Sequence, residues 1–396
     1  MTLRILTLST LYPDESRPNF GVFVERQTRE LVQQADFECI VMAPVGIPPW
    51  PLSRLAHYAP LAALPKEELY NGLEVHRPHF TVLPGTGGRF HVGAMTRAIL
   101  PLVRALHEEK AFDVIDASFF FPDGPVAANL SKALGIPFSV KARGADIHYW
   151  GSRPATRSDI LRAAKEAGGL LAVSEAMRRS MAGLGMDKRK IRVHYTGVDL
   201  DRFDIVDRAI ARADAKIDLN GPILLSVGAL VPRKGHDLLI RAMRDLPDAH
   251  LYIAGNGPER TALGKLATEC GVSLRVHFLG AVPHERLPTL INAADIMVLP
   301  SVSEGLANAW VEALACGTPI IISDVGGARE LLRDKVAGQI VERNPGVIAR
   351  AIRRMLKSPP DRIAVRQAAL PFTWAANANA LAEHFTRIVR QASAPQ

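Results

Sequence analysis

Short apolar stretches of strand length alternate with longer amphipathic stretches along almost the whole chain. This alternation predicts parallel β-sheets whose strands are joined by helices. Strands are expected in the first half at residues 3–9, 37–43, 73–78, 112–117, 137–142, 169–174 and 191–195. In the second half they are expected at residues 222–229, 250–255, 275–280, 295–300, 319–323 and 338–342. The sequence therefore predicts an α/β protein with two Rossmann-like sheets in tandem.

The boundary between the two halves is expected near residues 196–209, where the strand pattern gives way to a charged segment. We predict an N-terminal domain over 1–205, a C-terminal domain over 206–371 and a final helix within 372–396, with Thr373 as its N-cap. Between residues 46 and 73, a stretch rich in proline and aromatic residues is too irregular for a sheet element. A mobile loop or surface helix over a cleft and a packed surface insertion fit this stretch equally well.

Composition narrows the class of protein. The 396 residues have a near-average share of apolar and charged side chains, which suits globular domains rather than a disordered or fibrous chain. No apolar run reaches the roughly 18 residues of a membrane helix, and no signal-peptide pattern opens the chain, so a cytoplasmic protein is expected. Cys39, Cys270 and Cys316 lie outside any metal-ligand spacing, so buried free thiols are expected.

The net charge of +8 is compatible with nucleic acid, an anionic membrane surface or a phosphorylated substrate as partner. The densest basic stretch runs from Arg178 to Arg192, and a solvated helix end fits it as well as a binding surface does. No aromatic-rich RNA-binding pattern, zinc finger or basic coiled coil accompanies it, so we expect no nucleic-acid partner.

The strongest cluster of candidate functional residues lies at 300–321, which is expected to form a strand end, a tight turn, a helix and the next strand. Glu304 and Glu312 are separated by eight residues, or roughly 12 Å along a helix, a span that suits one extended ligand. Gly305 permits close approach of the backbone. The free amides of Leu306, Ala307 and Asn308 at the helix start form an expected phosphate site.

Two further loops are expected at the same sheet edge. One follows the strand that ends at Gly228 and brings Arg233 and Lys234 toward a diphosphate, although an ordinary basic loop is the alternative. The other contains Gly255 and Gly257, and a tight turn there is a candidate contact for a base or ribose. It lacks the third glycine of the dinucleotide fingerprint, which argues against a dehydrogenase.

In the first half, Gly21 lies in a loop before a helix, where its backbone would face a ligand. Arg143, Asp146 and His148 follow another strand and are candidate contacts for a sugar or acceptor, with a structural role equally open. The only DxD, at residues 199–201, lies in the expected linker, so no metal site is predicted there.

Together these motifs resemble glycosyltransferase family 4, over most of the chain from Gly21 to Trp374. The resemblance implies the GT-B architecture of two facing Rossmann-like domains, with a C-terminal helix crossing back to the first domain. It implies that Glu304 contacts the transferred sugar, that Glu312 contacts the nucleotide ribose and that Lys234 holds the diphosphate. It also implies a retaining, metal-independent front-face transfer, in which the leaving phosphate accepts the acceptor's proton.

The chain departs from the family pattern at two positions. Ala229 stands where many relatives have an arginine, and Arg233 is a candidate for supplying that charge. Arg143 stands where relatives often have a histidine, and His148 does not simply take over that histidine's role.

The expected donor is a nucleoside-diphosphate sugar, with UDP as first choice and GDP as second. The expected acceptor is a saccharide or lipid-linked saccharide used for cell-surface polysaccharide or glycolipid synthesis, presented at the cytoplasmic membrane face. The alternatives are a sugar-nucleotide epimerase of the same architecture and a non-catalytic nucleotide-sugar-binding subunit.

Overall fold

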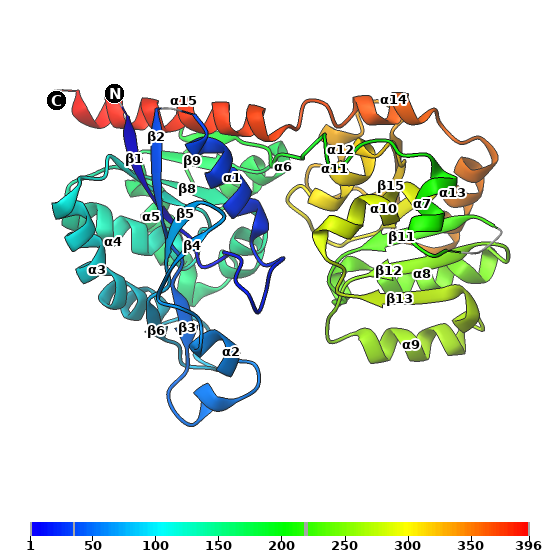
Figure 1. Ribbon diagram of the computed structural model, residues 1–396, viewed down its shortest axis with the longest axis horizontal. Helices are drawn as coiled ribbons and strands as arrows, with labels where there is room; N and C mark the ends of the chain where they lie inside the picture. Colours follow the sequence, from blue (N-terminus) through cyan, green and yellow to red (C-terminus); the bar gives the residue numbers. More distant parts are fainter. Residues whose placement is uncertain (1, 35, 218–220, 395–396) are drawn as a thin grey trace. The chain divides into compact units, whose positions relative to one another are not determined.

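The computed structural model describes residues 2–34, 36–217 and 221–394 (Figure 1). The chain forms two compact units, one of Met1–Thr196 with Trp374–Gln396 and one of Gly197–Thr373. We call them the first and second domains. Each has its own parallel sheet and its own apolar core, as the two-domain α/β pattern of the sequence predicts. Within the described residues, no helix is both long and apolar enough to cross a membrane.

The second domain is built on a six-stranded, fully parallel sheet. Its strands, in spatial order, are β13 (Val276–Gly280), β12 (His250–Ala254), β11 (Ile223–Val227), β14 (Ile296–Leu299), β15 (Ile320–Ser323) and β16 (Gly338–Val341). The four inner strands, β12, β11, β14 and β15, are buried for most of their length, which is why they appear in the sequence as nearly continuous apolar runs, whereas the edge strands β13 and β16 are only partly buried. Chain order reverses between β11 and β14, and ligands of open α/β sheets bind at such a switch point.

Helices surround this sheet in the alternating pattern that the sequence predicts. They are α7 (Arg208–Asp214), α8 (His236–Ala242), α9 (Arg260–Glu269), α10 (Leu287–Ala293), α11 (Asn308–Ala315), α12 (Ala328–Leu331), α13 (Pro345–Lys357) and α14 (Arg362–Gln367). One side of the core is formed by buried residues of α8, α9 and α13 packed on the strands, including Leu239, Leu266 and Ile352. Burial of such side chains contributes about 1.5–3 kcal/mol each, relative to full exposure.

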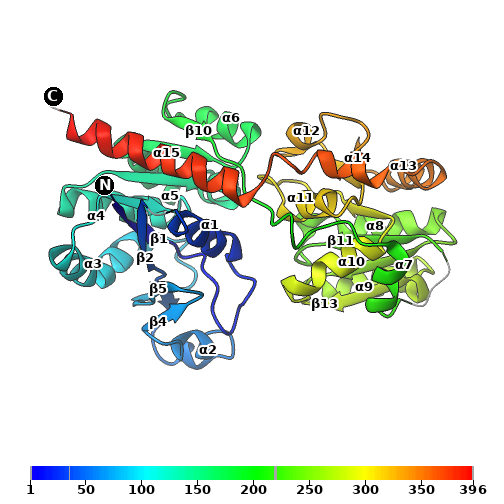
Figure 2. The same ribbon diagram turned by 45° about the horizontal axis from the view of Figure 1, so that its top comes forward.

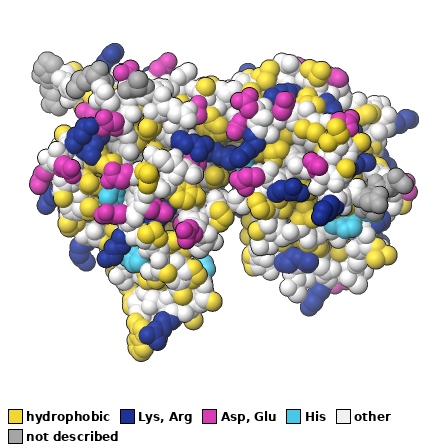
Figure 3. Space-filling model, viewed as in Figure 1, with side chains coloured by type: hydrophobic (Ala, Val, Ile, Leu, Met, Phe, Trp, Pro, Cys, Tyr) yellow, Lys and Arg dark blue, Asp and Glu magenta, His cyan; other side chains and the backbone are white. Residues whose placement is uncertain are grey.

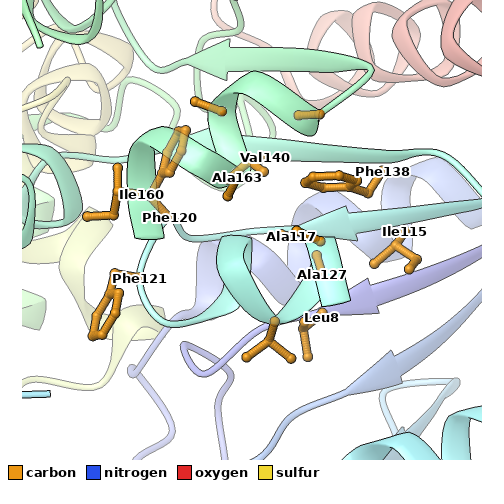
Figure 4. Packing of buried hydrophobic residues seen from close by; sticks show 14 of the residues in the cluster. Leu8, Ile115, Ala117, Phe120, Phe121, Ala127, Phe138, Val140, Ile160 and Ala163 are labelled. Carbon is orange, nitrogen blue, oxygen red and sulfur yellow. The ribbon is translucent and has the colours of Figure 1, made fainter. Parts of the chain in front are cut away.

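The first domain contains an eight-stranded sheet. Its spatial order is β10 (Ile191–Val193), β9 (Gly169–Ala172), β8 (Phe138–Ala142), β7 (Val114–Ala117), β1 (Leu3–Leu8), β2 (Phe37–Met42), β5 (Leu73–His76) and β4 (Glu67–Tyr70). Only β4 is antiparallel to its neighbour, and the switch point lies between β1 and β7. Its principal helices are α1 (Val22–Val32), α3 (His91–Glu109), α4 (Asp123–Leu134), α5 (Pro154–Glu166) and α6 (Glu175–Gly183). Figure 4 shows Phe121, Val140 and Ile160 among the side chains that fill the core.

The strands expected from apolar runs are all present, with ends shifted by at most two residues. Three short strands were not predicted, namely β3 (Val45–Ile47), β4 and β6 (His79–Thr81). The expectation of no sheet element between residues 46 and 73 is therefore wrong at both ends of that stretch. Its Pro-rich middle does lack strands, and holds a 3-10 turn (Leu52–Arg54) and the short helix α2 (Ala59–Ala62). Two glutamates hide β4 as a strand: Glu67 is exposed, and the half-buried Glu68 forms an ion pair with the buried Arg77 in place of an apolar contact.

The final helix, α15 (Trp374–Ser393), packs on the first domain against α1, β7 and β8 (Figures 1 and 2). Leu381, Phe385 and Ile388 complete a core cluster that includes residues of β1 and β7. Gly168 and Gly169 allow this close approach, because a Cβ at either position would lie within 3 Å of a side chain of α15. Of the three free cysteines, only Cys316 is buried, so the expectation of buried thiols fails for the half-buried Cys39 and Cys270.

Candidate active site

Two loops meet at the switch point of the second sheet. One follows β11 and the other follows β14, the two strands between which chain order reverses. The backbone N–H of Val302 donates to the carbonyl of Arg233 across 2.7 Å. Gly235 has a φ of +72°, and a Cβ there would lie 2.4 Å from the carbonyl oxygen of Pro300. The loops are therefore held together through backbone atoms, and only glycine fits at position 235.

Three charged side chains meet where these loops touch. The Nζ of Lys234 lies 2.5 Å from Oε1 of Glu304, and Nη1 of Arg233 lies 3.5 Å from Oε2 of the same carboxylate. Arg233 also donates to the carbonyl of Ser303 at 2.9 Å. The side chains of Glu304 and Lys234 are 8% and 12% exposed, whereas that of Arg233 is 48% exposed. The sequence-predicted basic pair and first glutamate therefore form one cluster, with the arginine on its outer side.

The turn after Glu304 presents unbonded backbone amides. Among the described residues, the N–H groups of Leu306, Ala307 and Asn308 have no acceptor. The structure corrects the expected helix start, because α11 begins at Asn308 with Ala307 as its N-cap, so Leu306 and Ala307 precede the helix. The carbonyl of Gly305 is taken by the N–H of Gly327 at 2.7 Å, which fixes the turn from behind. Free amides beside two cations make this corner attractive to an anion.

Glu312 lies on α11 and has a partner that sequence reasoning missed. The Nε2 of His284 lies 2.8 Å from Oε1 of Glu312, and both side chains are 10% exposed. Because a carboxylate only accepts, the imidazole is the donor. The ring of Phe203 packs edge-on against His284, with ring centroids 5.2 Å apart. One oxygen of Glu312 is therefore oriented by a histidine that lies 28 positions away in sequence, and a lone histidine gave no signal of this.

The three predicted glycines of the neighbouring loops have different surroundings. Gly228 lies beneath Lys234, whose Cδ and Cε would be 3.4 Å from a Cβ at this position. A Cβ on Gly255 would lie 1.9 Å from the carbonyl oxygen of Gly228, and one on Gly257 would lie 2.4 Å from that of Leu230. The loop 255–257 therefore packs directly on the loop that carries the basic pair, and its glycines are required by this contact.

His236 supports the same loop from below and was also missed. It is buried, lies 3.1 Å from the hydroxyl of Ser226 and 3.3 Å from the carbonyl of Ala229. Burial lowers its pKa to about 4, so the ring is neutral at physiological pH and donates to the carbonyl through Nε2. Because His236 directly follows Gly235 in a loop of basic residues, its position in the sequence gave no reason to expect that it is buried.

In the first domain, Gly21 lies at the loop after β1, on one side of that domain's switch point. It has a φ of +70°, and a Cβ would lie 2.4 Å from the carbonyl of Leu11, so α1 starts in close contact with that loop. Arg143, after β8, donates to the carbonyl of Ser118 at 2.7 Å and stacks on Phe23, 4.5 Å from its ring centroid. Its guanidinium is thus fixed at the carboxyl edge of the first sheet.

The other two predicted residues of this loop differ in setting. Asp146 is buried, and its oxygens accept backbone N–H groups of Phe120, Arg143 and Gly144 at 2.7–3.1 Å. It therefore joins the loops after β7 and β8. His148 is exposed. Asp123 was missed: it is fully buried, accepts from the N–H of Thr10 and has an Oδ1 without a partner. It is the first residue of α4, six positions after the end of β7, and nothing in that position marked it in the sequence.

The described residues of the two domains hold no cluster suited to a metal. Within residues 2–34, 36–217 and 221–394, no three His, Cys, Asp or Glu side chains come together for one. In the DxD at residues 199–201, Asp199 accepts the backbone N–H groups of Asp201 and Arg202 and so shapes a turn.

Comparisons with known proteins agree with this geometry. Residues 21–202 match the family model described as Glycosyltransferase Family 4, and residues 207–370 match that of Glycosyl transferases group 1. The chain is 36% identical over 216 residues to the D-inositol 3-phosphate glycosyltransferase of Mycobacterium leprae, covering 51% of this chain and 50% of the relative. For the Mycobacterium tuberculosis protein of that name, identity is 35% over 243 residues, covering 58% and 50%. The chain thus spans about half the length of these curated relatives.

Solved structures show the same fold. Sucrose-phosphate synthase from Thermosynechococcus elongatus superposes with a TM-score of 0.83 at 22% identity, over 98% of this chain and all of that one. HepE from Anabaena in complex with UDP-glucose gives a TM-score of 0.68 at 21% identity, over 99% and 98% of the two chains. The fold is that of the GT-B glycosyltransferases, two α/β domains with parallel sheets. With both family models matched in order, the chain belongs to glycosyltransferase family 4.

Proposed function

We propose that this protein is an enzyme that transfers a sugar from a nucleoside-diphosphate donor to an acceptor, with retention of the anomeric configuration. The observation that carries the proposal is the cluster of Lys234, Arg233 and Glu304 beside the free amides of residues 306–308. It unites a place for a diphosphate with a carboxylate suited to sugar hydroxyls. It lies at the switch point of the second sheet, where ligands of this fold class bind.

Lys234 has the central role in the proposed mechanism. In the absence of a donor its ammonium neutralises Glu304, and a bound diphosphate would give the same cation a second anionic neighbour. As the bond to the sugar breaks, negative charge develops on the leaving phosphate. Lys234, Arg233 and the fixed amides are positioned to stabilise that charge without rearranging, and so to lower the barrier. The leaving phosphate then accepts the acceptor's proton, and no metal is required.

The two glutamates have separate roles in this proposal. Glu304 binds hydroxyls of the transferred sugar, because it lies beside the cations that hold the diphosphate. Glu312 binds the ribose through the oxygen that His284 does not occupy. UDP is our first choice of base, supported by the fold shared with HepE, which has been solved with UDP-glucose, and GDP is the second.

We propose a saccharide or lipid-linked saccharide as acceptor, bound through the first domain at the cytoplasmic membrane face. Arg143 and His148, at the carboxyl edge of the first sheet, are the proposed contacts. Exposed Trp50, Leu52 and Leu55 support a membrane role, and hydrophobic side chains gather on the end of the first domain that carries α2 (Figure 3). The basic stretch supports it less, because Arg178 and Arg189 are paired with neighbouring acids.

A nucleotide panel followed by turnover assays tests the proposal. Thermal shift with UDP, GDP, ADP and CDP should single out one nucleotide, since a ligand at 100 times its dissociation constant adds about 2.7 kcal/mol of stability. Mass spectrometry should then show slow hydrolysis of the matching nucleotide sugar. An epimer formed without acceptor would instead identify an epimerase, and binding without any hydrolysis or transfer would indicate a non-catalytic subunit.

A further inference from the structure

The first domain contains an open pocket of about 500 Å³ that none of the residues discussed so far lines. Its wall is formed by Tyr58 before α2, residues within 82–88 after β6, His91 at the start of α3, and residues within 149–153 after β8. The pocket thus opens beside the carboxyl end of β8, the edge at which this fold class binds ligands. Its volume falls within the roughly 300–1,000 Å³ of small-molecule sites.

One side of the pocket is aromatic. The Trp150 ring packs on Phe121 with centroids 4.9 Å apart, and Tyr149 meets Trp150 edge-on at 5.0 Å. Tyr149 is about half exposed, so part of this aromatic surface faces solvent. A sugar or cyclitol ring has C–H groups on its face and hydroxyls at its rim, so it can lie flat on such a surface while its hydroxyls stay hydrated.

The pocket also contains a cation without an anionic partner. The guanidinium of Arg153 lies 4.1 Å from the ring centroid of Tyr149 and 5.7 Å from that of Trp150. Among the described residues, this side chain forms no ion pair and donates no hydrogen bond, and no acidic residue lines the pocket. The stacking fixes the plane of the guanidinium while its N–H groups remain available to an anion.

A glycine loop borders this cation. Gly87 and Gly88 have consecutive positive φ angles of +63° and +86°, and their backbone N–H groups have no acceptor among the described residues. A Cβ on Gly87 would lie 3.5 Å from Nη1 of Arg153, which places this loop directly beside the guanidinium. Successive free amides in such a turn favour a group with several oxygens, such as phosphate.

From these observations we infer that the pocket binds a ring-shaped polyol that carries a phosphate, with the ring against Tyr149 and Trp150 and the phosphate between Arg153 and the loop 87–88. This inference rests on the proposed function, because it identifies the ligand as the acceptor. Two sources carry the same chemistry, a soluble sugar phosphate and the head group of a phospholipid whose phosphate bears a ring.

Calorimetry on the full chain tests the soluble source. Glucose 6-phosphate should bind more tightly than glucose or inorganic phosphate, because only it engages both parts of the pocket. Arg153→Gln should lower the affinity for glucose 6-phosphate roughly tenfold or more. Arg153→Lys should lower that affinity less, since the charge remains and only the planar guanidinium is lost. Arg157→Gln is the matched control, because this exposed arginine lies outside the pocket in the first turn of α5, the helix whose N-cap is Arg153, and should leave binding unchanged.

Vesicle flotation tests the lipid source. Vesicles with phosphatidylinositol should bind better than vesicles with an equal charge of phosphatidylglycerol, and Arg153→Gln should remove the difference. A preference for the ring-bearing phosphate in either assay, lost in Arg153→Gln, supports the inference. No such preference in either assay, or one that Arg153→Gln leaves intact, overturns it.

Binding of UDP, measured on the same samples, separates this inference from the proposed function. Arg153→Gln should bind UDP as the unaltered protein does, which also shows that the variant is folded. If UDP binds and no ring phosphate does, only the pocket inference falls. If ring phosphates bind through Arg153 but no nucleotide binds, the pocket stands and the proposed function falls.

Discussion

His284 donates a 2.8 Å hydrogen bond to Glu312 and thereby connects the segment before α10 with the middle of α11. Both side chains are nearly buried, so water competes little for this bond. The carboxylate is left with one oxygen engaged and one available, in a fixed orientation. Within the proposed function, His284 would therefore be a positioning residue, which acts on the ribose through Glu312.

Replacing His284 tests this relationship. His284→Ala should lower the affinity for UDP roughly tenfold, because Glu312 loses the hydrogen-bond donor that orients it. His284→Gln should retain part of that affinity, because its side-chain amide can donate instead. The comparison of UDP with 2′-deoxy-UDP and 3′-deoxy-UDP by calorimetry gives a specific readout, since the loss should be smaller for the analogue that lacks the bonded hydroxyl. His250→Ala is the control. Equal weakening of all three nucleotides would indicate a merely structural histidine.

The proposed roles of Glu304, Glu312 and Lys234 predict that substitutions of these three residues have distinguishable effects on turnover and nucleotide binding. Glu304→Gln should lower turnover strongly and leave UDP affinity nearly intact, because this side chain is assigned to the sugar. Glu312→Gln should weaken the binding free energy of UDP by roughly 1.5–3 kcal/mol. Lys234→Ala should impair both, because the bound diphosphate and the leaving group use the same cation. Calorimetry and turnover decide: full turnover in all three would exclude this site, and exchanged phenotypes of the glutamates would reverse their roles.

The contact of Gly255 with Gly228 predicts a large effect of a single methyl group. In Gly255→Ala the new Cβ would lie 1.9 Å from a backbone oxygen, which forces the two loops apart and should destabilise the second domain by more than about 2 kcal/mol. Gly271 also has a positive φ, +68° against +152° at Gly255, but a Cβ there would meet nothing within 4 Å, so Gly271→Ala should cost only about 1–2 kcal/mol of backbone strain. Urea unfolding compares them, and equal losses would contradict the argument from packing.

The docking of α15 should weaken in acid. His384 is buried against the hydroxyl of Ser139, and burial lowers its pKa to about 3 from an ordinary value of 6.5. The unfolded chain therefore binds a proton below pH 6.5 that the folded chain does not, so stability falls as the pH drops from about 6.5 toward 3. Its full contribution is present above pH 6.5.

Hydrogen exchange of the α15 amides measures this effect at pH 7.5 and pH 5. The unaltered protein should lose up to about 2 kcal/mol more than His384→Gln between these values, since each pKa unit corresponds to 1.36 kcal/mol. The buried pair of His194 and Lys141 remains in both proteins, so the difference isolates His384. An identical pH dependence in the two proteins would assign the acid sensitivity to other groups.

Membrane binding should depend on the apolar residues near Trp50. The side chain of Trp50 is 73% exposed, and Leu52 and Leu55 near it are also exposed, beside Arg54. Flotation should show binding to anionic vesicles that weakens with salt, and Trp50→Ser should reduce it. Leu274→Ser, which removes an exposed apolar residue from the second domain, is the control. Equal binding to neutral and anionic vesicles at low salt would contradict the prediction.

The sequence predicts the sheets well because their strands are buried on both faces. The inner strands β11, β12, β14 and β15 are buried, largely apolar runs between polar segments, and that pattern is easily recognised. The short strands β3, β4 and β6 do not show this pattern, because three or four residues at a sheet edge are too few for a recognisable periodicity of apolar positions. The grouping of Lys234 with Glu304 was predictable too, since carboxyl ends of parallel strands share one edge.

The partners behind the site were not predictable in the same way. The bond of His284 to Glu312 depends on how α10 and α11 pack, and nothing in the local sequence of either residue encodes it. The unpartnered Oδ1 of Asp123 likewise becomes visible only when the loops after β1 and β7 are seen together. Motif reasoning finds residues that would touch a ligand, whereas those that orient them are defined by tertiary contacts.

The first domain combines two segments that are far apart in sequence, because α15 (Trp374–Ser393) packs on the sheet that residues 3–8 begin. During synthesis, the apolar surface around β1 and β7 stays uncovered until the whole second domain has emerged from the ribosome, because Leu381, Phe385 and Ile388 are made after that domain. The first domain thus begins to be synthesised before the second domain, but its core is completed only after the second domain has been made. Loss of α15 would therefore damage the domain that contains residues 3–8 and leave the sheet of the second domain, whose strands all lie between residues 223 and 341, intact.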